Sequence, residues 1–269
     1  MGVGTAILAY VLAGQPVAAL QPTSKWTIDY ADDYCTVGRA YGSSEKPVVL
    51  GIEADVMGHG VQVAFIDSRI NGKFESRAIH VQFAPEGVPI TFDGGTLPVG
   101  QKGVQKLVFH LDETGILRLK DATWLAADVR KNSPVALDVA GVPAALAALE
   151  KCRVDLVSSW GMNPTEQARV KVSAKLIPNL AKHGIFNTDD YPTAALRERQ
   201  SGSTSVRLRI EADGRPADCT VTRSSGSVAL DTTTCRVIMQ RARYVPALDV
   251  EGKPMASIDT AKINWAIPQ

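Results

Sequence analysis

Histidines and acidic pairs are the first residues to test for catalysis, and their spacing gives no active site. No histidine lies in an H-E-x-x-H motif, no serine lies in a G-x-S-x-G motif, and no Walker or dinucleotide-binding glycine pattern occurs. The pairs Asp32-Asp33 and Asp189-Asp190 are adjacent, and adjacent side chains of a strand point to opposite faces. We therefore predict no catalytic residue, no metal site and no cofactor. An enzyme housed in residues 26–162 is the alternative, and it requires a pocket with a convergent acid–base pair.

The four cysteines favour disulfide chemistry over metal binding, because no closely spaced C-x-x-C ligand pair is present. Cys219 falls on the inward-facing set of its predicted strand, and Cys235 falls on the apolar stripe of the predicted helix that follows. We therefore predict a Cys219–Cys235 bridge, which leaves Cys35 to pair with Cys152. Sequence alone allows three connectivities, and four buried thiols in a reducing compartment are the alternative.

The N-terminus resembles a secretory signal peptide. Met1 to Ser24 contains no charged side chain, and Val17-Ala18-Ala19 has the small-residue pattern of a cleavage site. We predict a signal peptide over residues 1–19, cleavage after Ala19, and a periplasmic location. Because the n-region lacks Lys and Arg, an uncleaved inner-membrane anchor facing the periplasm is the alternative. Its apolar run of about ten residues is shorter than the roughly twenty that cross a bilayer.

Composition and periodicity predict two folded regions. An apolar content of 45% and a charged content of 21% are typical of a folded protein. The net charge of +1, with no basic tract, argues against a nucleic-acid partner. Residues 26–162 contain many short alternating runs separated by Gly, Pro and Asn, which predicts a β-rich sandwich or barrel. A helix with its apolar stripe between Pro143 and Gly161 closes this domain.

Residues 163–186 are predicted to be a linker, and residues 187–269 a small α+β domain. Within the latter, Val206, Leu208 and Ile210 alternate with polar residues on a half-buried strand that ends at a turn. A return strand, a helix and a final alternating strand follow. The expected fold is a three-stranded antiparallel sheet with helices on one face.

The order of short motifs in this last region resembles the C-terminal domain of TonB, over about residues 187–269. The motifs are Tyr191-Pro192, Asp213-Gly214, Ser224-Ser225-Gly226, Leu230-Asp231, Pro246-Ala247, Gly252-Lys253-Pro254 and Ile263-Asn264-Trp265. Each is weak alone, but their order and spacing together are specific. The resemblance implies a module that binds a protein strand and performs no chemistry.

The resemblance also implies where binding occurs. Domains of the TonB family pair their last strand with an extended peptide, the TonB box of an outer-membrane transporter. Carried over, the receiving edge runs from Thr260 to Ile267, with Lys262 and Asn264 facing outward and Tyr191-Pro192 near the groove. Trp265 shares the phase of Ile263 and is expected to be core.

The predicted function is a periplasmic protein-binding module that docks to outer-membrane TonB-dependent transporters, or to another envelope protein, by strand addition. TonB itself carries a transmembrane anchor and a long Pro-rich spacer, whereas a folded β-rich domain occupies the spacer's place here. Two alternatives follow: a membrane-anchored energy transducer of the TonB type, and a structural envelope protein without a transport role.

Overall fold

The computed structural model describes residues 8–9, 17–43, 45–56, 60–67, 70, 75–99, 104–130 and 133–267. The chain divides into two compact units, Met1–Leu156 and Val157–Gln269. Most of the predicted signal peptide lies outside the described residues, apart from the short strands β1 (Leu8–Ala9) and β2 (Val17–Ala18) and residue Ala19.

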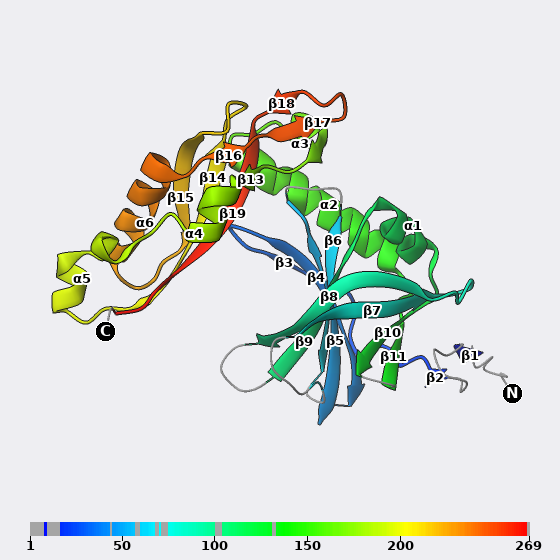
Figure 1. Ribbon diagram of the computed structural model, residues 1–269. Coiled ribbons are helices and arrows are strands. Elements are labelled where there is room, and N and C mark those ends of the chain that lie inside the picture. The colour runs from blue at the N-terminus through cyan, green and yellow to red at the C-terminus, as the bar shows by residue number, and fades with distance from the viewer. Residues whose placement is uncertain are drawn as a thin grey trace, which may run out of the picture. The chain divides into compact units, whose positions relative to one another are not determined.

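The first unit is a nine-stranded antiparallel sheet that curls into a half-barrel (Figure 1). The strand order is β11-β10-β7-β8-β9-β6-β5-β4-β3. The strands are β3 (Thr27–Tyr30), β4 (Cys35–Ser43), β5 (Lys46–Ala54), β6 (Val61–Asp67), β7 (Glu75–Phe83), β8 (Ile90–Val99), β9 (Val104–Leu111), β10 (Trp124–Arg130) and β11 (Ser133–Asp138). The prediction of a β-rich, barrel-like domain is therefore confirmed, and the sandwich alternative is replaced by a single curled sheet.

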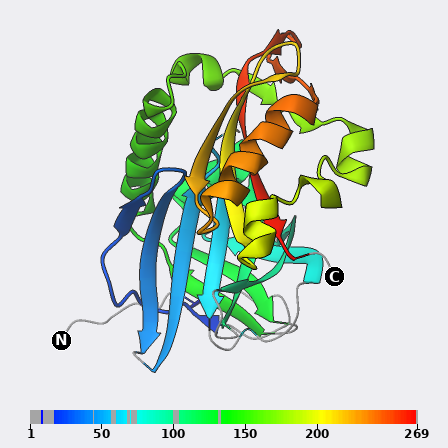
Figure 2. The same cartoon turned by 90° about the vertical axis from the view of Figure 1, so that its left-hand side faces the viewer.

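Side-chain alternation explains the inner face of this sheet. On β5, Val48, Leu50 and Ile52 are fully buried, whereas the residues between them are only half-buried, as expected for a strand with one face on a core. Two helices complete the unit, α1 (Glu113–Asp121) and α2 (Val142–Ser159), seen from a second direction in Figure 2. A disulfide joins Cys35 of β4 to Cys152 on the buried side of α2.

The two edge strands of this sheet are β3 and β11. The segment that precedes β3 forms hydrogen bonds with part of β11. The Leu20 N–H donates to the Ala136 carbonyl (2.8 Å), and the Asp138 N–H donates back to the Leu20 carbonyl (3.0 Å). The Tyr41 hydroxyl donates to the Asp138 carbonyl (2.8 Å). Strand β11 therefore has part of its outer edge occupied by the chain's own backbone.

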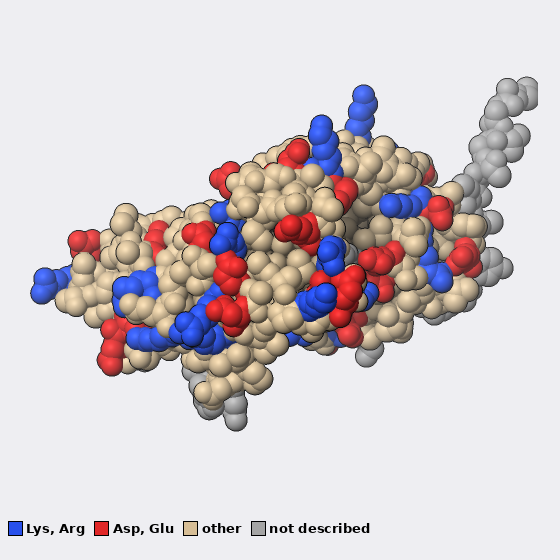
Figure 3. Space-filling model, turned by 90° about the horizontal axis from the view of Figure 1, so that it is seen from above, with Lys and Arg blue, Asp and Glu red and all other residues tan. Residues whose placement is uncertain are grey.

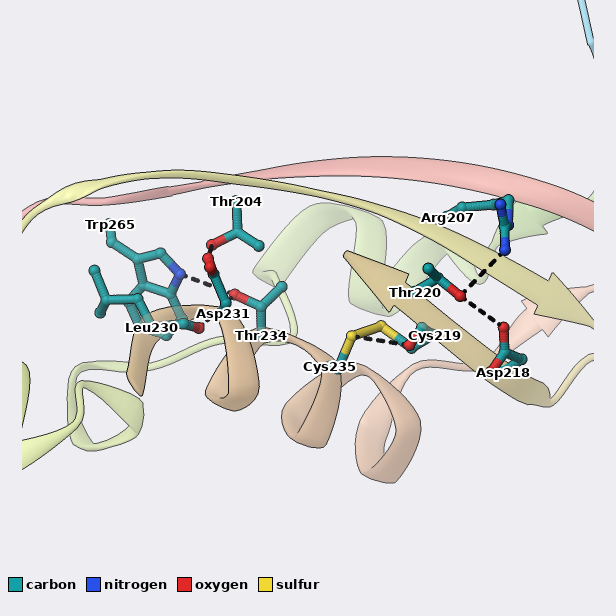
Figure 4. Close-up of a disulfide and its surroundings, with 10 residues drawn as sticks. All are labelled: Thr204, Arg207, Asp218, Cys219, Thr220, Leu230, Asp231, Thr234, Cys235 and Trp265. Carbon is teal, nitrogen blue, oxygen red and sulfur yellow. Dashed lines mark hydrogen bonds between the residues drawn. A yellow bond between two sulfur atoms is a disulfide. The ribbon is translucent and has the colours of Figure 1, made fainter. Parts of the chain in front are cut away.

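The second unit contains a three-stranded antiparallel sheet of order β15-β14-β19, made of β14 (Gly202–Ile210), β15 (Pro216–Arg223) and β19 (Ser257–Trp265). Helix α6 (Val228–Arg241) packs on one face of it (Figure 4). This confirms the predicted small α+β fold.

Short elements complete the second unit. Four short elements precede β14 along the chain. They are the helices α3 (Pro164–Gln167), α4 (Pro178–His183) and α5 (Thr193–Arg197) and the 3-10 turn η1 (Thr188–Asp190). Strands β12 (Val170–Val172), β17 (Ala247–Asp249) and β18 (Pro254–Met255) form one small sheet, and β13 (Lys175–Leu176) and β16 (Tyr244–Val245) form another. Two short segments of the stretch predicted as a linker, β12 and β13, thus pair with strands of the second unit. The division into residues 26–162, 163–186 and 187–269 stays a prediction.

Candidate functional site

The last strand of the chain, β19, is paired along one side only. Each of its residues faces a residue of β14, from Ser257 opposite Ile210 to Trp265 opposite Gly202. Across the residues that the structure describes, no other strand pairs with β19. An unpaired strand edge carries a row of free N–H and C=O groups, which is a template for another strand.

The backbone groups that face this open edge can be identified from the neighbouring turn. The Glu211 N–H donates to the Arg215 carbonyl across the β14–β15 turn (2.9 Å). Because hydrogen-bonding groups alternate sides along a strand, the odd-numbered residues of β14 face β15 and the even-numbered ones face β19. In the observed register, the residues of β19 whose backbone groups point away from β14 are Ile258, Thr260, Lys262 and Asn264.

One contact agrees with this assignment and also limits the open stretch. The Thr260 N–H donates to the Asp259 Oδ1 atom (2.9 Å), which requires that N–H to point away from the β14 ladder. Burial raises the pKa of the Asp259 carboxyl, while hydrogen bonds from Tyr244 and the Thr260 N–H oppose that shift. Because Ile258 is buried, the exposed residues whose outward amides are clear of this contact are Lys262 and Asn264.

The side chains of β19 alternate between two environments. Thr260, Lys262 and Asn264 are exposed, on the face away from α6. Ser203 of β14 donates to the Asn264 Oδ1 atom (2.6 Å) on that same face. Ile263 is half-buried and Trp265 is 7% exposed, on the face that α6 covers. From Thr260 onward the strand thus presents polar side chains on one face and apolar ones on the other.

Trp265 anchors the end of the strand. Its indole N–H donates to the Thr234 hydroxyl of α6 (2.9 Å; Figure 4). Phe186 and Tyr191 each meet its ring edge-to-face, with ring centroids 5.4 Å apart in both pairs. Tyr191 is itself 7% exposed, and Pro192 is the N-cap residue of α5. Tyr191 is therefore a core residue that packs beside the end of β19, and little of its side chain is exposed to solvent.

The segment before Tyr191 is held by an ion pair between buried Asp190 and exposed Arg241, which the sequence did not indicate. The Asp190 carboxylate accepts hydrogen bonds from both terminal nitrogens of Arg241 (2.6 and 2.8 Å) and from the Asn187 N–H (2.8 Å). Burial alone would raise the pKa of Asp190, but these hydrogen bonds outweigh it and hold the pKa below its usual value. Arg241 lies in the last turn of α6, far along the chain, so no local pattern reveals the pair.

An open pocket of ≈ 370 Å³ lies between this segment and the end of β19. Its lining residues are Phe186, Asn187, Thr188, Tyr191, Ile263, Asn264, Trp265 and Ala266. Phe186, Asn187 and Thr188 fall where the sequence shows neither periodicity nor a functional motif, so they were missed. None of the lining side chains is charged.

A second pocket, of ≈ 480 Å³, lies near β12 and β17, and most of its charged lining residues form ion pairs. Arg169 contacts Asp249 and Glu251, with N–O distances of 3.2 and 2.5 Å, and Arg209 contacts Glu211. On the face shown in Figure 3, basic and acidic side chains are similarly interspersed. Of the charged residues that line this pocket, Glu166 alone lies outside these ion pairs, and it is exposed.

The remaining motif residues hold the sheet against α6. The Asp231 carboxylate accepts hydrogen bonds from the Thr204 hydroxyl (2.8 Å), the Ser225 N–H (2.9 Å) and the Ser224 hydroxyl (2.5 Å). Burial would raise its pKa, but these donors lower it below the usual value. Further along α6, Cys235 is disulfide-bonded to Cys219 of β15 (Figure 4).

The Asp213-Gly214 motif also has a structural role. Gly214 has φ +81°, and a Cβ atom there would lie 2.1 Å from the Tyr244 carbonyl oxygen. The Tyr244 N–H donates to the Gly214 carbonyl (2.8 Å). Only glycine fits this combination of left-handed backbone and close approach.

Comparison with known proteins identifies this domain. Residues 188–267 match the family model described as Gram-negative bacterial TonB protein C-terminal, and form a TonB C-terminal domain. This family is generally non-enzymatic. No curated protein matches the chain. No helix within the described ranges is long and apolar enough to span a membrane, and no group of three or more His, Cys, Asp or Glu residues there could hold a metal ion.

Proposed function

We propose that residues 188–267 bind an extended peptide of another envelope protein by adding it as a strand to β19. The observation that carries this proposal is the open edge of β19, with the amides of Lys262 and Asn264 pointing away from β14. In strand addition, main-chain hydrogen bonds supply affinity and alternate side chains supply selectivity. Thr260 lies at the edge of the same stretch, and Tyr191 and Pro192 lie on the segment that flanks it.

The partner we propose is an outer-membrane TonB-dependent transporter, whose periplasmic face is accessible to a domain located in the periplasm. The TonB C-terminal match over residues 188–267 supports that class of partner. The two disulfides support an oxidising compartment such as the periplasm. Residues 26–162 would then be a second periplasmic domain carried by the same chain.

A TonB-type energy transducer is the second candidate, and the family match favours it equally. The two candidates differ in whether the N-terminal segment stays in the inner membrane. Mass spectrometry of the protein purified from its own envelope separates them: a mature chain that begins at Leu20 excludes the anchored transducer.

Strand addition is tested by removing one outward amide. A synthetic peptide copying the TonB box of an outer-membrane transporter is titrated into the ¹⁵N-labelled protein lacking residues 1–19, and amide shifts are followed by NMR. We expect the amides of Lys262 and Asn264 to shift on binding. Lys262→Pro should weaken binding by about fivefold, since one main-chain hydrogen bond is worth about 1 kcal/mol.

Lys262→Ala is the matched control, because it removes the side chain and keeps the N–H. It should bind within about twofold of the parent, since surface side chains away from specific contacts contribute little. Equal binding by Lys262→Pro and Lys262→Ala, or a binding surface away from β19, would exclude strand addition at this edge.

A further inference from the structure

We infer that the pocket between residues 186–191 and the end of β19 takes one apolar side chain of the added strand and so fixes its register. This inference rests on the proposed strand addition and specifies the guest's chemistry. The pocket lies beside the amide of Asn264, and its wall includes Ile263 and Trp265 of the same strand.

The face of the pocket follows from strand geometry. Residues directly opposite each other in a sheet place their side chains on the same face. Ile263 and Trp265 project to the face that α6 covers, where Phe186 and Tyr191 lie. A guest residue opposite Ile263 therefore directs its side chain into this pocket. Its two neighbours project to the other face, beside the exposed side chains of Lys262 and Asn264.

The lining selects against charge. Five of the lining residues are aromatic or aliphatic, and the other three are polar but uncharged; the five are Phe186, Tyr191, Ile263, Trp265 and Ala266. The nearby charges of Asp190 and Arg241 are already paired with each other. A charged guest side chain would lose water here without gaining a counter-ion, which is costly, whereas an apolar one gains by burial.

The walls are fixed before any guest arrives. The Trp265 ring is held by the Thr234 hydroxyl and by two edge-to-face contacts. The segment that carries Phe186 and Thr188 is tied to α6 through Asp190 and Arg241. A preformed pocket lowers the ordering cost of binding, so its side-chain preference should appear directly in the affinity.

The open stretch also has an end that restricts register. The Asp259 carboxylate occupies the Thr260 N–H, and Ile258 beyond it is buried, so the exposed stretch of outward amides begins at Lys262. The pocket lies at the other end of that stretch. A guest strand is therefore positioned by two amides and one buried side chain.

The test is an aspartate scan of the same TonB-box peptide, combined with a variant that fills the pocket. Each peptide residue is replaced by Asp in turn and binding is measured by NMR titration. We expect one position to lose about tenfold to a hundredfold in affinity, the range given by burying one aliphatic side chain. The parent peptide should also shift the indole N–H signal of Trp265.

The filling variant is Thr188→Trp, whose larger side chain is placed at the pocket wall, and its control is Thr193→Trp on the exposed surface of α5. In Thr188→Trp the parent peptide should bind as weakly as the sensitive Asp peptide, and that Asp substitution should cost nothing further. In Thr193→Trp its full cost should remain. Ile263→Ala, which enlarges the pocket, should shift the preference at the sensitive position towards larger apolar side chains.

The outcomes separate this inference from the proposed function. If no position is selectively sensitive, or if Thr188→Trp and the Asp substitution act additively, the pocket is not a subsite even though Lys262→Pro still weakens binding. If Thr188→Trp and Ile263→Ala both leave the side-chain preference at the sensitive peptide position unchanged, the inference likewise fails. If the parent peptide does not bind at all, strand addition itself fails, and the pocket inference with it.

Discussion

The nine-stranded sheet of the first unit and the three-stranded sheet β15-β14-β19 of the second unit differ in how their edges are protected. In the first unit, one edge strand, β3, is only four residues long, and the other, β11, is partly covered by backbone hydrogen bonds to Leu20. In the second unit, the edge strand β19 is nine residues long and pairs on one side only, within the described residues.

Short or covered edges are the usual protection against unwanted pairing. Within the described residues, long strands that pair on one side only are thus a feature of the second unit, where β15 has eight residues and β19 has nine. Lys262 on β19 is the kind of charged residue that keeps an open edge from self-association. The first sheet has short or covered edges, whereas the second unit leaves two strands unpaired on one side. We propose β19 as the edge that a partner uses, because the pocket lined by Tyr191 and Trp265 lies beside it.

The largest expected effects come from removing the disulfides. Because each unit contains one disulfide, removing each in turn shows how much it stabilises its own unit. Cys35–Cys152 spans a sequence separation of 117 and Cys219–Cys235 one of 16. In the chain-entropy model, replacing both cysteines of a pair by Ala costs about 5 kcal/mol for the first pair and about 3 kcal/mol for the second.

Differential scanning calorimetry of the two double variants measures this difference. We expect each variant to lower the unfolding transition of its own unit and to leave the other nearly unchanged. A larger loss for the Cys219–Cys235 pair would show that the second unit depends on its staple more than the chain-entropy model predicts.

A pair of proline substitutions sharpens the comparison at the open edge. Ala261 directs its N–H towards β14, whereas Lys262 directs its N–H away from it. Ala261→Pro should therefore lower the free energy of unfolding by about 2–3 kcal/mol, because it orphans a carbonyl of the ladder. Lys262→Pro should cost less than about 1 kcal/mol, since proline is tolerated where the N–H faces solvent on an edge strand.

Urea unfolding of the two variants, followed by tryptophan fluorescence, gives both values. The reverse order, with Lys262→Pro the more damaging, would mean that the outward amides belong to the other set of residues. The assignment of the binding edge would then have to shift by one residue.

The sequence indicated the parts of this edge that depend on local patterns. Alternating apolar residues predicted β14 and the final strand, and the motifs that tie them to α6 gave the family resemblance that the match over residues 188–267 confirms. The Asp213-Gly214 turn was readable because glycine alone fits there. These features are short-range, so they leave a signal in neighbouring residues.

The features that the sequence did not reveal depend on distant residues or on very short elements. The small sheets use strands of two or three residues, too short to show a period of two. Asp190 and Arg241 meet across a sequence separation of 51, so neither residue predicts the other. The pocket walls at Phe186 and Thr188 are fixed by that pair, and they were hidden for the same reason.

The smallest expected effect concerns this ion pair and its dependence on pH. Hydrogen bonds from Arg241 and the Asn187 N–H lower the pKa of Asp190 in the folded protein, despite its burial. A carboxyl whose folded pKa is depressed contributes its full stabilisation above the unfolded value, about 3.9, and loses it as pH falls through the folded value. Asp190→Asn should therefore destabilise the second unit by about 1.5 kcal/mol near neutral pH.

Thermal unfolding of the parent and of Asp190→Asn, measured from pH 7 down to pH 2, checks the sign. The gap between the two should be constant above about pH 4 and should close below it. Asp189→Asn is the matched control, because Asp189 is exposed and does not contact Arg241 in the structure. A gap that widened as the pH fell would mean that the Asp190 carboxylate is a cost to the fold, and the wall beside the open edge would need another support.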